Sequence, residues 1–183
     1  MDSRGRPPGL LNLRTTVEAC ETLTDPKNIT LFEQFGVLSE VELRSRQEIM
    51  MENYAKVLNI EAQTMIIMAS RQIIPAVEAY LGQLSETAAN KQKVCGDEAI
   101  TLEKELITRL SALNAKTFRA VEALRQADRE ATAAGDAHAV ACAFRDKVVP
   151  AMASLRAPVD EMETLMPSKL WPLPTYGEMT YQQ

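Results

Sequence analysis

The sequence has little glycine, few aromatic residues and only one histidine. Its seven glycines form neither the phosphate-binding pattern G-x-x-x-x-G-K-[ST] nor the dinucleotide-binding pattern G-x-G-x-x-G. The single histidine, His138, excludes histidine-rich metal sites and any catalytic scheme that needs two histidines. An isolated histidine near a helix start is most often a surface or packing residue. The sequence therefore excludes nucleotide binding by either loop and predicts no histidine-based catalysis.

Cysteine is also scarce. Cys20, Cys95 and Cys142 are odd in number and far apart, with no pair at the spacing of a zinc site or a disulfide framework. The N-terminus has no continuous apolar segment typical of a secretory signal. The most apolar stretch, residues 60–77, is too short and too often interrupted by polar residues to span a membrane. These features predict a reduced, cytoplasmic protein without a membrane partner.

Charge and composition limit the fold and the partners. The 25 acidic and 20 basic residues give a net charge of -5, and no basic block is present, so a nucleic-acid partner is not expected. Aromatic residues make up 5% of the chain, and no segment alternates apolar and polar residues as half-buried strands do. A hydrophobic content of 46% over 183 residues suffices for the core of one domain. The fold class predicted is all-α.

The longest helical pattern runs from Ser39 to about Lys93. It begins with the S-x-x-E capping arrangement of Ser39 and Glu42. Pro75 lies inside the pattern and predicts a kink or a break. The stretch 60–77 is apolar on more than one face, which predicts a position at the centre of a bundle, covered on several sides. The predicted buried stripe of this helix is Leu43, Met50, Tyr54, Val57, Leu58, Met65, Met68, Val77, Leu81, Leu84 and Ala88.

Shorter patterns complete the fold. Residues 1–9, with Pro7-Pro8-Gly9, are expected to be flexible, and residues 10–183 to form one helical domain. Short helices are predicted over residues 17–23 and 26–36, and a long helix over 97–134 should run antiparallel to the central one. A last helix starts near Asp136 and is interrupted by Pro150 and Pro158. The prediction is an antiparallel helical bundle around one long central helix, with short N-terminal helices.

A repeated pentapeptide and a proline-rich C-terminal segment give two further predictions. The pentapeptide Ile73-Ile74-Pro75-Ala76-Val77 and the pentapeptide Val148-Val149-Pro150-Ala151-Met152 share one order of residue types, and each is expected to mark a bend. The segment Leu170-Trp171-Pro172-Leu173-Pro174-Thr175-Tyr176 predicts an extended C-terminal tail. Docking of this tail is favoured over exposure, because two aromatic residues between prolines are costly to leave in water.

No catalytic, cofactor-binding or metal-binding residue is predicted. The acidic residues Glu48, Glu52 and Glu61 suggest a di-iron bundle at first sight, but such a site also needs Glu-x-x-His pairs, and the sequence has none. Solvated or salt-bridged helix faces explain these glutamates better. Methionines at positions 50, 51, 65 and 68 suggest either an adaptable groove for a partner helix or core filling, and core filling is favoured.

Several segments, in order, resemble the C-terminal domain of type III glutamine synthetases. The resemblance extends from about Leu13 to Tyr181. Departures are Gln47, where an aromatic residue is expected, Pro158 and Gly177. The segments are Asn12 to Ala19, Lys27-Asn28-Ile29 with Leu31-Phe32-Glu33 and Gly36-Val37, Glu42 to Arg46, Asn59 to Ala62 with Thr64-Met65, Ile74 to Val77, Arg145-Asp146 with Val149 to Met152, and Leu170 to Tyr176.

The resemblance implies a non-catalytic helical part of an ATP-dependent ligase that makes glutamine from glutamate and ammonia in a homo-oligomer. ATP and magnesium would bind to the catalytic part of the full enzyme, and no cofactor is expected in this chain. The expected partners are the catalytic domain and neighbouring subunits, and the expected role is in assembly or regulation. The alternative is a free-standing helical module for protein interaction. An independent enzyme is disfavoured, because no acid, base, nucleophile and metal-ligand set converges.

Overall fold

The computed structural model of the chain describes residues 11–174 and 176–180. Every regular element in these residues is a helix, which confirms the predicted all-α class. The predicted flexible segment, residues 1–9, lies outside the described residues. No helix within the described ranges is both long enough and apolar enough to cross a membrane. The α-helices are α1 (Thr16–Glu21), α2 (Pro26–Gln34), α3 (Glu40–Met68), α4 (Ile74–Cys95), α5 (Thr101–Thr132), α6 (Ala137–Ala143), α7 (Val149–Leu165) and α8 (Tyr176–Thr180).

Capping boxes fix the starts of α1 and α3. The Ser39 hydroxyl accepts a hydrogen bond from the Glu42 N–H, and the Glu42 carboxylate accepts one from the Ser39 N–H at 2.8 Å. Thr15 and Glu18 form the same reciprocal pair at α1. Each box satisfies two backbone N–H groups that lack a helical acceptor. The predicted start of the central helix is therefore confirmed.

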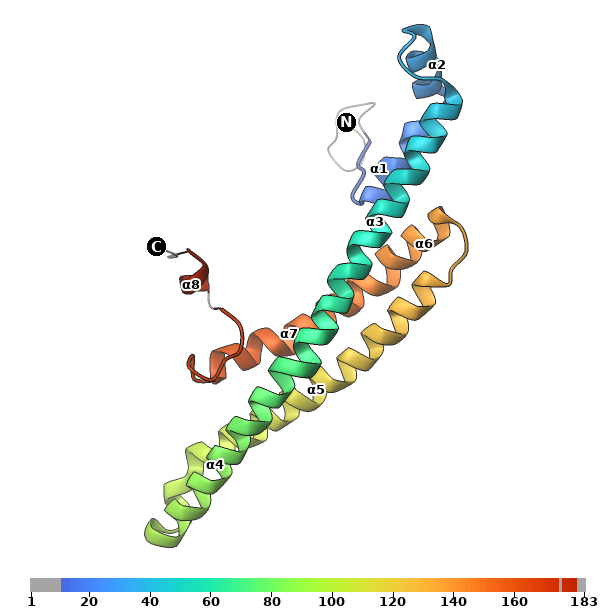
Figure 1. Ribbon diagram of the computed structural model, residues 1–183. Coiled ribbons are helices and arrows are strands. Elements are labelled where there is room, and N and C mark those ends of the chain that lie inside the picture. The colour runs from blue at the N-terminus through green and yellow to red at the C-terminus, as the bar shows by residue number, and fades with distance from the viewer. Residues whose placement is uncertain (1–10, 175, 181–183) are drawn as a thin grey trace, which may run out of the picture.

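The central helix is one long rod in which α3 continues through the π-helical segment Ala69–Ile73 into α4 (Figure 1). The kink or break predicted at Pro75 takes the form of this π-helical segment, which ends just before the proline. Proline has no N–H to donate, and its ring presses on the carbonyl four residues earlier. In the wider π turn just before it, the N–H of Ile74 donates to the carbonyl of Ala69, five residues earlier. The bulge accommodates the proline without ending the rod.

The second pentapeptide has the same local structure. The π-helical segment Phe144–Val148 links α6 to α7, and the N–H of Val149 donates to the carbonyl of Phe144 just before Pro150. The predicted interruption at Pro158 is wrong, because α7 continues through that residue. Ser154, whose carbonyl loses its helical donor there, lies on the exposed side of α7, where water can hydrogen-bond to it. The repeated pentapeptide thus marks two π-bulges.

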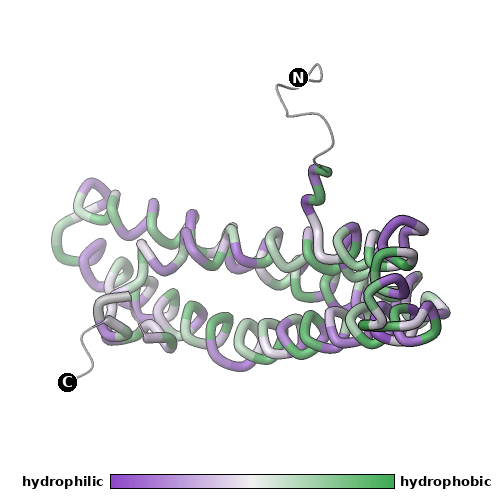
Figure 2. The backbone as a smooth tube through the Cα atoms, turned by 90° about the horizontal axis from the view of Figure 1, so that it is seen from above, coloured by the Kyte–Doolittle hydropathy of each residue, from purple (hydrophilic) through white to green (hydrophobic). Residues whose placement is uncertain are grey.

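Helix α5 runs antiparallel to the central rod. Three cross-helix hydrogen bonds show this, since they join Gln63 to Asp128, Glu78 to Asn114 and Lys91 to Glu103, one number rising as the other falls. Helix α6 packs on α3, while α7 packs on α5. Figure 2 shows the helices lying lengthwise beside one another, with hydrophobic and hydrophilic positions mixed along each. The larger core cluster is Ala55, Ala62, Ile66, Ala69, Val121, Leu124, Ala131, Phe144, Val148 and Leu155.

The inward face of the central rod differs from the predicted stripe. Met50 and Val57 are exposed, while Met51, Ile66 and Ile73 are buried. Small residues line much of the true inward face, because alanine lets neighbouring helices approach closely. The buried alanines of the rod are Ala55, Ala62, Ala69 and Ala88. A stripe of large apolar side chains therefore misplaces Met50 and Val57 in α3, whereas Leu43 is buried and Tyr54, Leu58 and Met65 pack against the core as predicted.

The middle of the rod is also less covered than predicted. Ile60 and Ile67 are exposed, so the chain does not bury this stretch on every side. The apolar character of residues 60–77 thus exceeds what the core of this chain uses. Surface left apolar in this way is typical of contact with another domain or chain.

The C-terminal segment begins with a turn. The N–H groups of Leu170 and Trp171 both donate to the carbonyl of Pro167, at 2.9 and 3.1 Å. Trp171 is 7% exposed and belongs to a buried hydrophobic cluster that includes Leu84 of α4, Leu110 of α5 and Met162 of α7. The short helix α8 follows at Tyr176–Thr180, so a wholly extended tail is not confirmed.

Candidate functional site

The three glutamates considered for a metal site lie on α3. Glu52 forms an ion pair with Lys56 at 2.7 Å, one turn along the same helix. Glu48 and Glu61 are exposed. Among the described residues, these carboxylates are not brought into a cluster with histidine or cysteine. Their positions agree with solvated helix faces.

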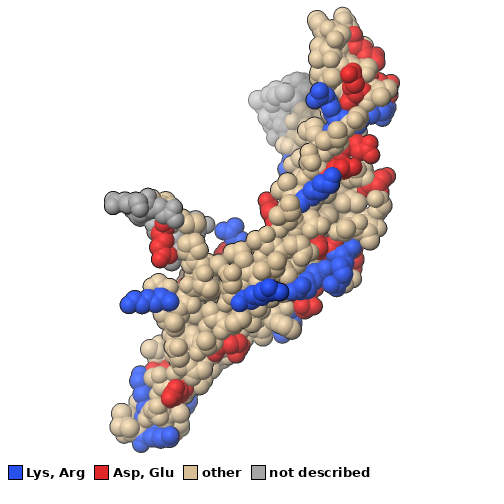
Figure 3. Space-filling model, viewed as in Figure 1, with Lys and Arg blue, Asp and Glu red and all other residues tan. Residues whose placement is uncertain are grey.

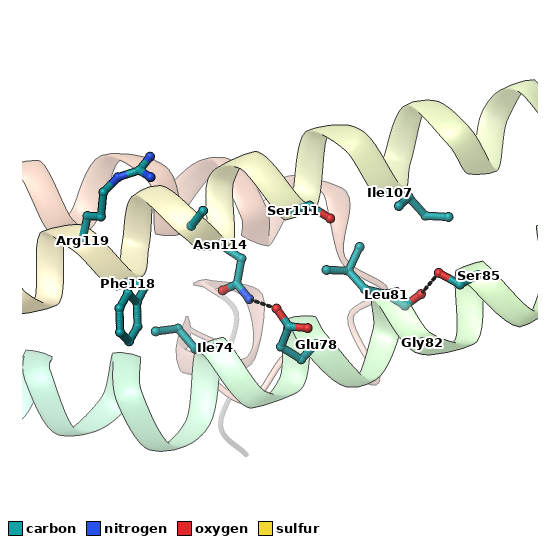
Figure 4. A pocket seen from close by; sticks show the side chains of 11 residues that line it. Ile74, Glu78, Leu81, Gly82, Ser85, Ile107, Ser111, Asn114, Phe118 and Arg119 are labelled. Carbon is teal, nitrogen blue, oxygen red and sulfur yellow. Dashed lines mark hydrogen bonds between the residues drawn. The ribbon is translucent and has the colours of Figure 1, made fainter.

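A groove of about 550 Å³ lies between α4 and α5. Figure 4 shows Glu78 and Asn114 pointing toward each other across it, while Arg119 points away. Asn114 Nδ2 donates to Glu78 Oε1 at 2.7 Å. Ile74, Leu81, Ile107 and Phe118 supply most of the apolar lining, and the remaining residues are Gly82, Ser85, Ser111 and Ala115.

The groove is suited to binding and lacks catalytic groups. Asn114 is 4% exposed, and its Oδ1 has no hydrogen-bond partner in the described part of the chain. Ser85 is engaged, because its Oγ donates to the Leu81 carbonyl at 2.8 Å. The lining contains one carboxylate and no histidine, lysine or cysteine, so no nucleophile and base face each other.

Glu103 is a buried carboxylate with one charged partner. Lys91 on α4 donates to Glu103 Oε1, and this hydrogen bond is the main reason why the pKa of Glu103 lies below its ordinary value of 4.5. Such a pair fixes how two helices are positioned lengthwise. Each member of the pair is the charged partner of the other. We therefore assign the pair to structure.

Replacing Lys91 with methionine is expected to lower the melting temperature at neutral pH, because it leaves the Glu103 carboxylate buried without its partner. Because the folded pKa is below the unfolded one, the pair stabilises the fold above about pH 4.5, and this contribution is lost as the pH falls. Acidification should therefore lower the melting temperature of Lys91→Met less than that of the parent. Lys93→Met, at an exposed position, is the control. Parallel melting curves for both variants at neutral and acidic pH would contradict the assignment.

A second group of polar side chains joins α1 to α6. Glu21 Oε1 lies 2.7 Å from His138 Nε2, and Cys142 Sγ lies 3.7 Å from the same nitrogen. The three ligand-type atoms all lie within 4.8 Å of one another. Burial, and then the nearby carboxylate of Glu21, raise the pKa of the Cys142 thiol, although Arg145 opposes the shift.

The sequence prediction missed this group. His138 and Cys142 are four residues apart, so a shared helix face is visible in the sequence, but Glu21 is 117 residues from His138. Gln47, which departs from the expected aromatic residue, donates to the carbonyl of Cys20 at 2.9 Å and so ties the end of α1 to α3. Only the tertiary structure brings Glu21 to the histidine.

An apolar surface covers the end of the molecule at α2 and the start of α3. Phe35 is 70% exposed and Val41 is 77% exposed, with Val37 between them. A hollow of about 630 Å³ nearby is lined by Leu23, Leu38, Glu42, Ser45, Arg46, Ile49 and Met50. Helix α2 lies at one tip of the elongated molecule (Figure 1). On the face seen in Figure 3, acidic and basic side chains are interspersed along the length of the molecule. Apolar residues gathered at one tip favour contact with another protein surface.

Comparison with known proteins gives consistent matches. The model of the glutamine synthetase C-terminal domain matches residues 4–92. A glutamine synthetase of Butyrivibrio fibrisolvens is 30% identical over 173 residues, which are 94% of this chain and 25% of that protein. The type-3 glutamine synthetase of Dictyostelium discoideum is 29% identical over 177 residues, 94% of this chain and 24% of that protein. A glutamine synthetase of Bacteroides fragilis is 25% identical over 177 residues, which are 94% of this chain and 24% of that protein. The chain spans about a quarter of the length of these relatives.

Proposed function

We propose that this chain is the non-catalytic helical part of a type III glutamine synthetase, with a role in subunit assembly or regulation, because the model of the glutamine synthetase C-terminal domain matches residues 4–92 and the type-3 enzyme of Dictyostelium discoideum matches 94% of the chain. The observation that carries the proposal is the extent of the match, which takes in 94% of this chain but only about a quarter of each relative. The groove between α4 and α5 agrees with it, because its lining can bind but holds no catalytic pair. Glutamine synthesis, with ATP and magnesium, is assigned to the remainder of the full enzyme.

The apolar tip supports a role in assembly. Phe35, Val37 and Val41 are large, exposed and close together in the sequence, and Ile60 and Ile67 are further exposed apolar residues of the rod. A chain that exposes this much apolar surface gains stability when another protein covers it. We assign this surface to contact with the catalytic domain or a neighbouring subunit of a homo-oligomeric, cytoplasmic enzyme.

The alternative is a free-standing interaction module that binds partners through the groove between α4 and α5. The observation that favours it is the exposed ring of Phe118 beside the buried amide of Asn114. Sequencing the full-length transcript separates the two. A reading frame that continues upstream into a catalytic domain supports the synthetase domain, and a transcript that encodes this chain alone supports the module.

The isolated chain is expected to bind no ATP and to make no glutamine. Its sequence lacks both glycine-rich phosphate loops, and the metal-ligand group found in the described residues, Glu21 with His138 and Cys142, offers only one carboxylate, whereas magnesium prefers oxygen ligands. Isothermal titration of the purified chain with magnesium and ATP should give only heats of dilution. The full-length enzyme, titrated in parallel, is the positive control. A saturable heat of binding to the isolated chain would overturn the assignment as a non-catalytic part.

A further inference from the structure

The side chains of Glu21, His138 and Cys142 offer three different metal-binding atoms at one place on the surface. Carboxylate oxygen, imidazole nitrogen and thiolate sulfur are the ligands that zinc takes in proteins. We propose that these three residues form a zinc site that fastens the end of α1 to α6. The proposal is independent of any role in glutamine synthesis, because it concerns only residues of this chain.

The distances suit a tetrahedral ion. With Zn–S near 2.3 Å and Zn–N near 2.0 Å, a tetrahedral ion holds sulfur and nitrogen about 3.5 Å apart. Cys142 Sγ lies 3.7 Å from His138 Nε2. Glu21 Oε1 lies 2.7 Å from the same nitrogen, the length of a hydrogen bond, and an ion between them would widen this to about 3.3 Å. A small rotation of the exposed Glu21 side chain supplies this change.

The backbone holds the three ligands in place before any ion binds. Asp136 caps α6, its carboxylate accepting the Ala139 N–H at 2.8 Å, and this positions the turn that carries His138 and Cys142. Behind them, Val17 and Cys20 of α1 pack in one buried cluster with Met51 and Ala141. The C-terminal end of α1 is also bound to α3, because Gln47 Nε2 donates hydrogen bonds to the carbonyls of Cys20 and Glu21. Ligands on such a packed scaffold lose little conformational freedom on binding an ion.

Charged groups of both signs surround Cys142. Burial is the main cause that raises the pKa of its thiol, the guanidinium of Arg145 acts against the shift, and the carboxylates of Glu21, Asp146 and Asp136 act with it. Arg145 is the opposing cation, but it is engaged with Asp146 at 2.7 Å. On binding, the Cys142 thiol releases its proton to solvent, and His138 carries its single ring proton on Nδ1 while Nε2 binds the ion. Three protein ligands leave the fourth position of a tetrahedral ion to water.

Cobalt(II) is the probe for this site, because a thiolate bound to it absorbs in the near ultraviolet. Titration of the purified full chain under reducing conditions should give this band at one equivalent, and zinc should displace it. Cys142→Ser should abolish the band, whereas Cys95→Ser, at an exposed cysteine far along the chain, should leave it unchanged. Loss of residues that only support metal ligands already costs about 10- to 100-fold in affinity. His138→Gln and Glu21→Gln should therefore weaken zinc binding by at least about tenfold.

A second readout uses the two accessible cysteines of the unmodified chain. Zinc should slow alkylation of Cys142 by at least about tenfold, since a ligated thiolate is protected, and leave alkylation of Cys95 unchanged. Circular dichroism should show that all variants retain the parent helix content. The proposal is refuted if Cys142→Ser or His138→Gln binds zinc as tightly as the parent, or if zinc protects both cysteines equally.

Discussion

Replacing Ile66 with aspartate is expected to prevent the chain from folding. Ile66 is 1% exposed and belongs to the core cluster that also contains Val121, Leu124 and Phe144. An unpaired carboxylate at this place costs several kcal/mol or stays protonated at a similar cost. Domains of this size are stable by only about 5–15 kcal/mol, so one such change can remove most of the stability. Circular dichroism should show loss of most helical signal and of the cooperative melting transition.

The neighbouring residue gives a matched control. Ile67 is the same residue type in the same helix, but it is 50% exposed. Ile67→Asp changes helix propensity and charge just as Ile66→Asp does, so any difference between them reports burial alone. We expect Ile67→Asp to fold and to melt near the parent temperature. Similar melting curves for the two variants would show that the inward face of α3 is not the one described.

Local signals in the sequence predicted the outline of this fold well. The capping box at Ser39 and the glycines at the helix ends act through backbone groups within a few residues, so they can be recognised without tertiary contacts. Gly36, Gly96 and Gly135 all have positive φ values, where a side chain would be strained. The order of the main helices and the antiparallel course of α5 follow from such boundaries together with the helical spacing of apolar residues, whereas the short helix α8 was not predicted.

The sequence pattern could not predict fully which residues of the central rod face the core, because this depends on how the helices pack. Ala55, Ala62 and Ala69 occupy the inward face of α3, and their small size carries little weight in a stripe of apolar residues. The π-bulge before Pro75 also shifts the faces of the rod by one residue, which a constant helical period does not anticipate. Met50, which lies well before the bulge, was expected in the core because a stripe of large apolar residues includes it, yet it is exposed.

The candidate site illustrates the same limit. His138 and Cys142 share a helix face that their spacing reveals, but the Glu21 ligand depends on how α1 packs against α6. The polar pair of Glu78 and Asn114 likewise joins helices whose alignment is a tertiary property. Residue types and spacing identify sites that lie within one helix, whereas sites between helices need the register of packing.

Replacing Trp171 with alanine is expected to destabilise the chain by about 3 kcal/mol, toward the lower end of the range for a large buried aromatic residue. Trp171 is 7% exposed and lies in one buried cluster with Leu84 of α4, Leu110 of α5 and Met162 of α7, so it joins the C-terminal segment to the core formed by these helices. For a chain of this length, the loss corresponds to a fall in melting temperature of roughly 10 °C. Thermal melts followed by circular dichroism measure it.

Trp171→Phe is the matched control, because it keeps an aromatic ring and removes the buried Nε1–H, which has no hydrogen-bond partner among the described residues. It should therefore lower the melting temperature far less than Trp171→Ala. Trp171 is the only tryptophan in the sequence, so intrinsic fluorescence of the parent chain reports this residue alone. Acrylamide should quench it much less efficiently than a peptide of residues 167–175. Quenching as efficient as in the peptide, together with unchanged melting of Trp171→Ala, would show that the segment does not dock on this bundle and would leave Trp171 as a contact for another domain.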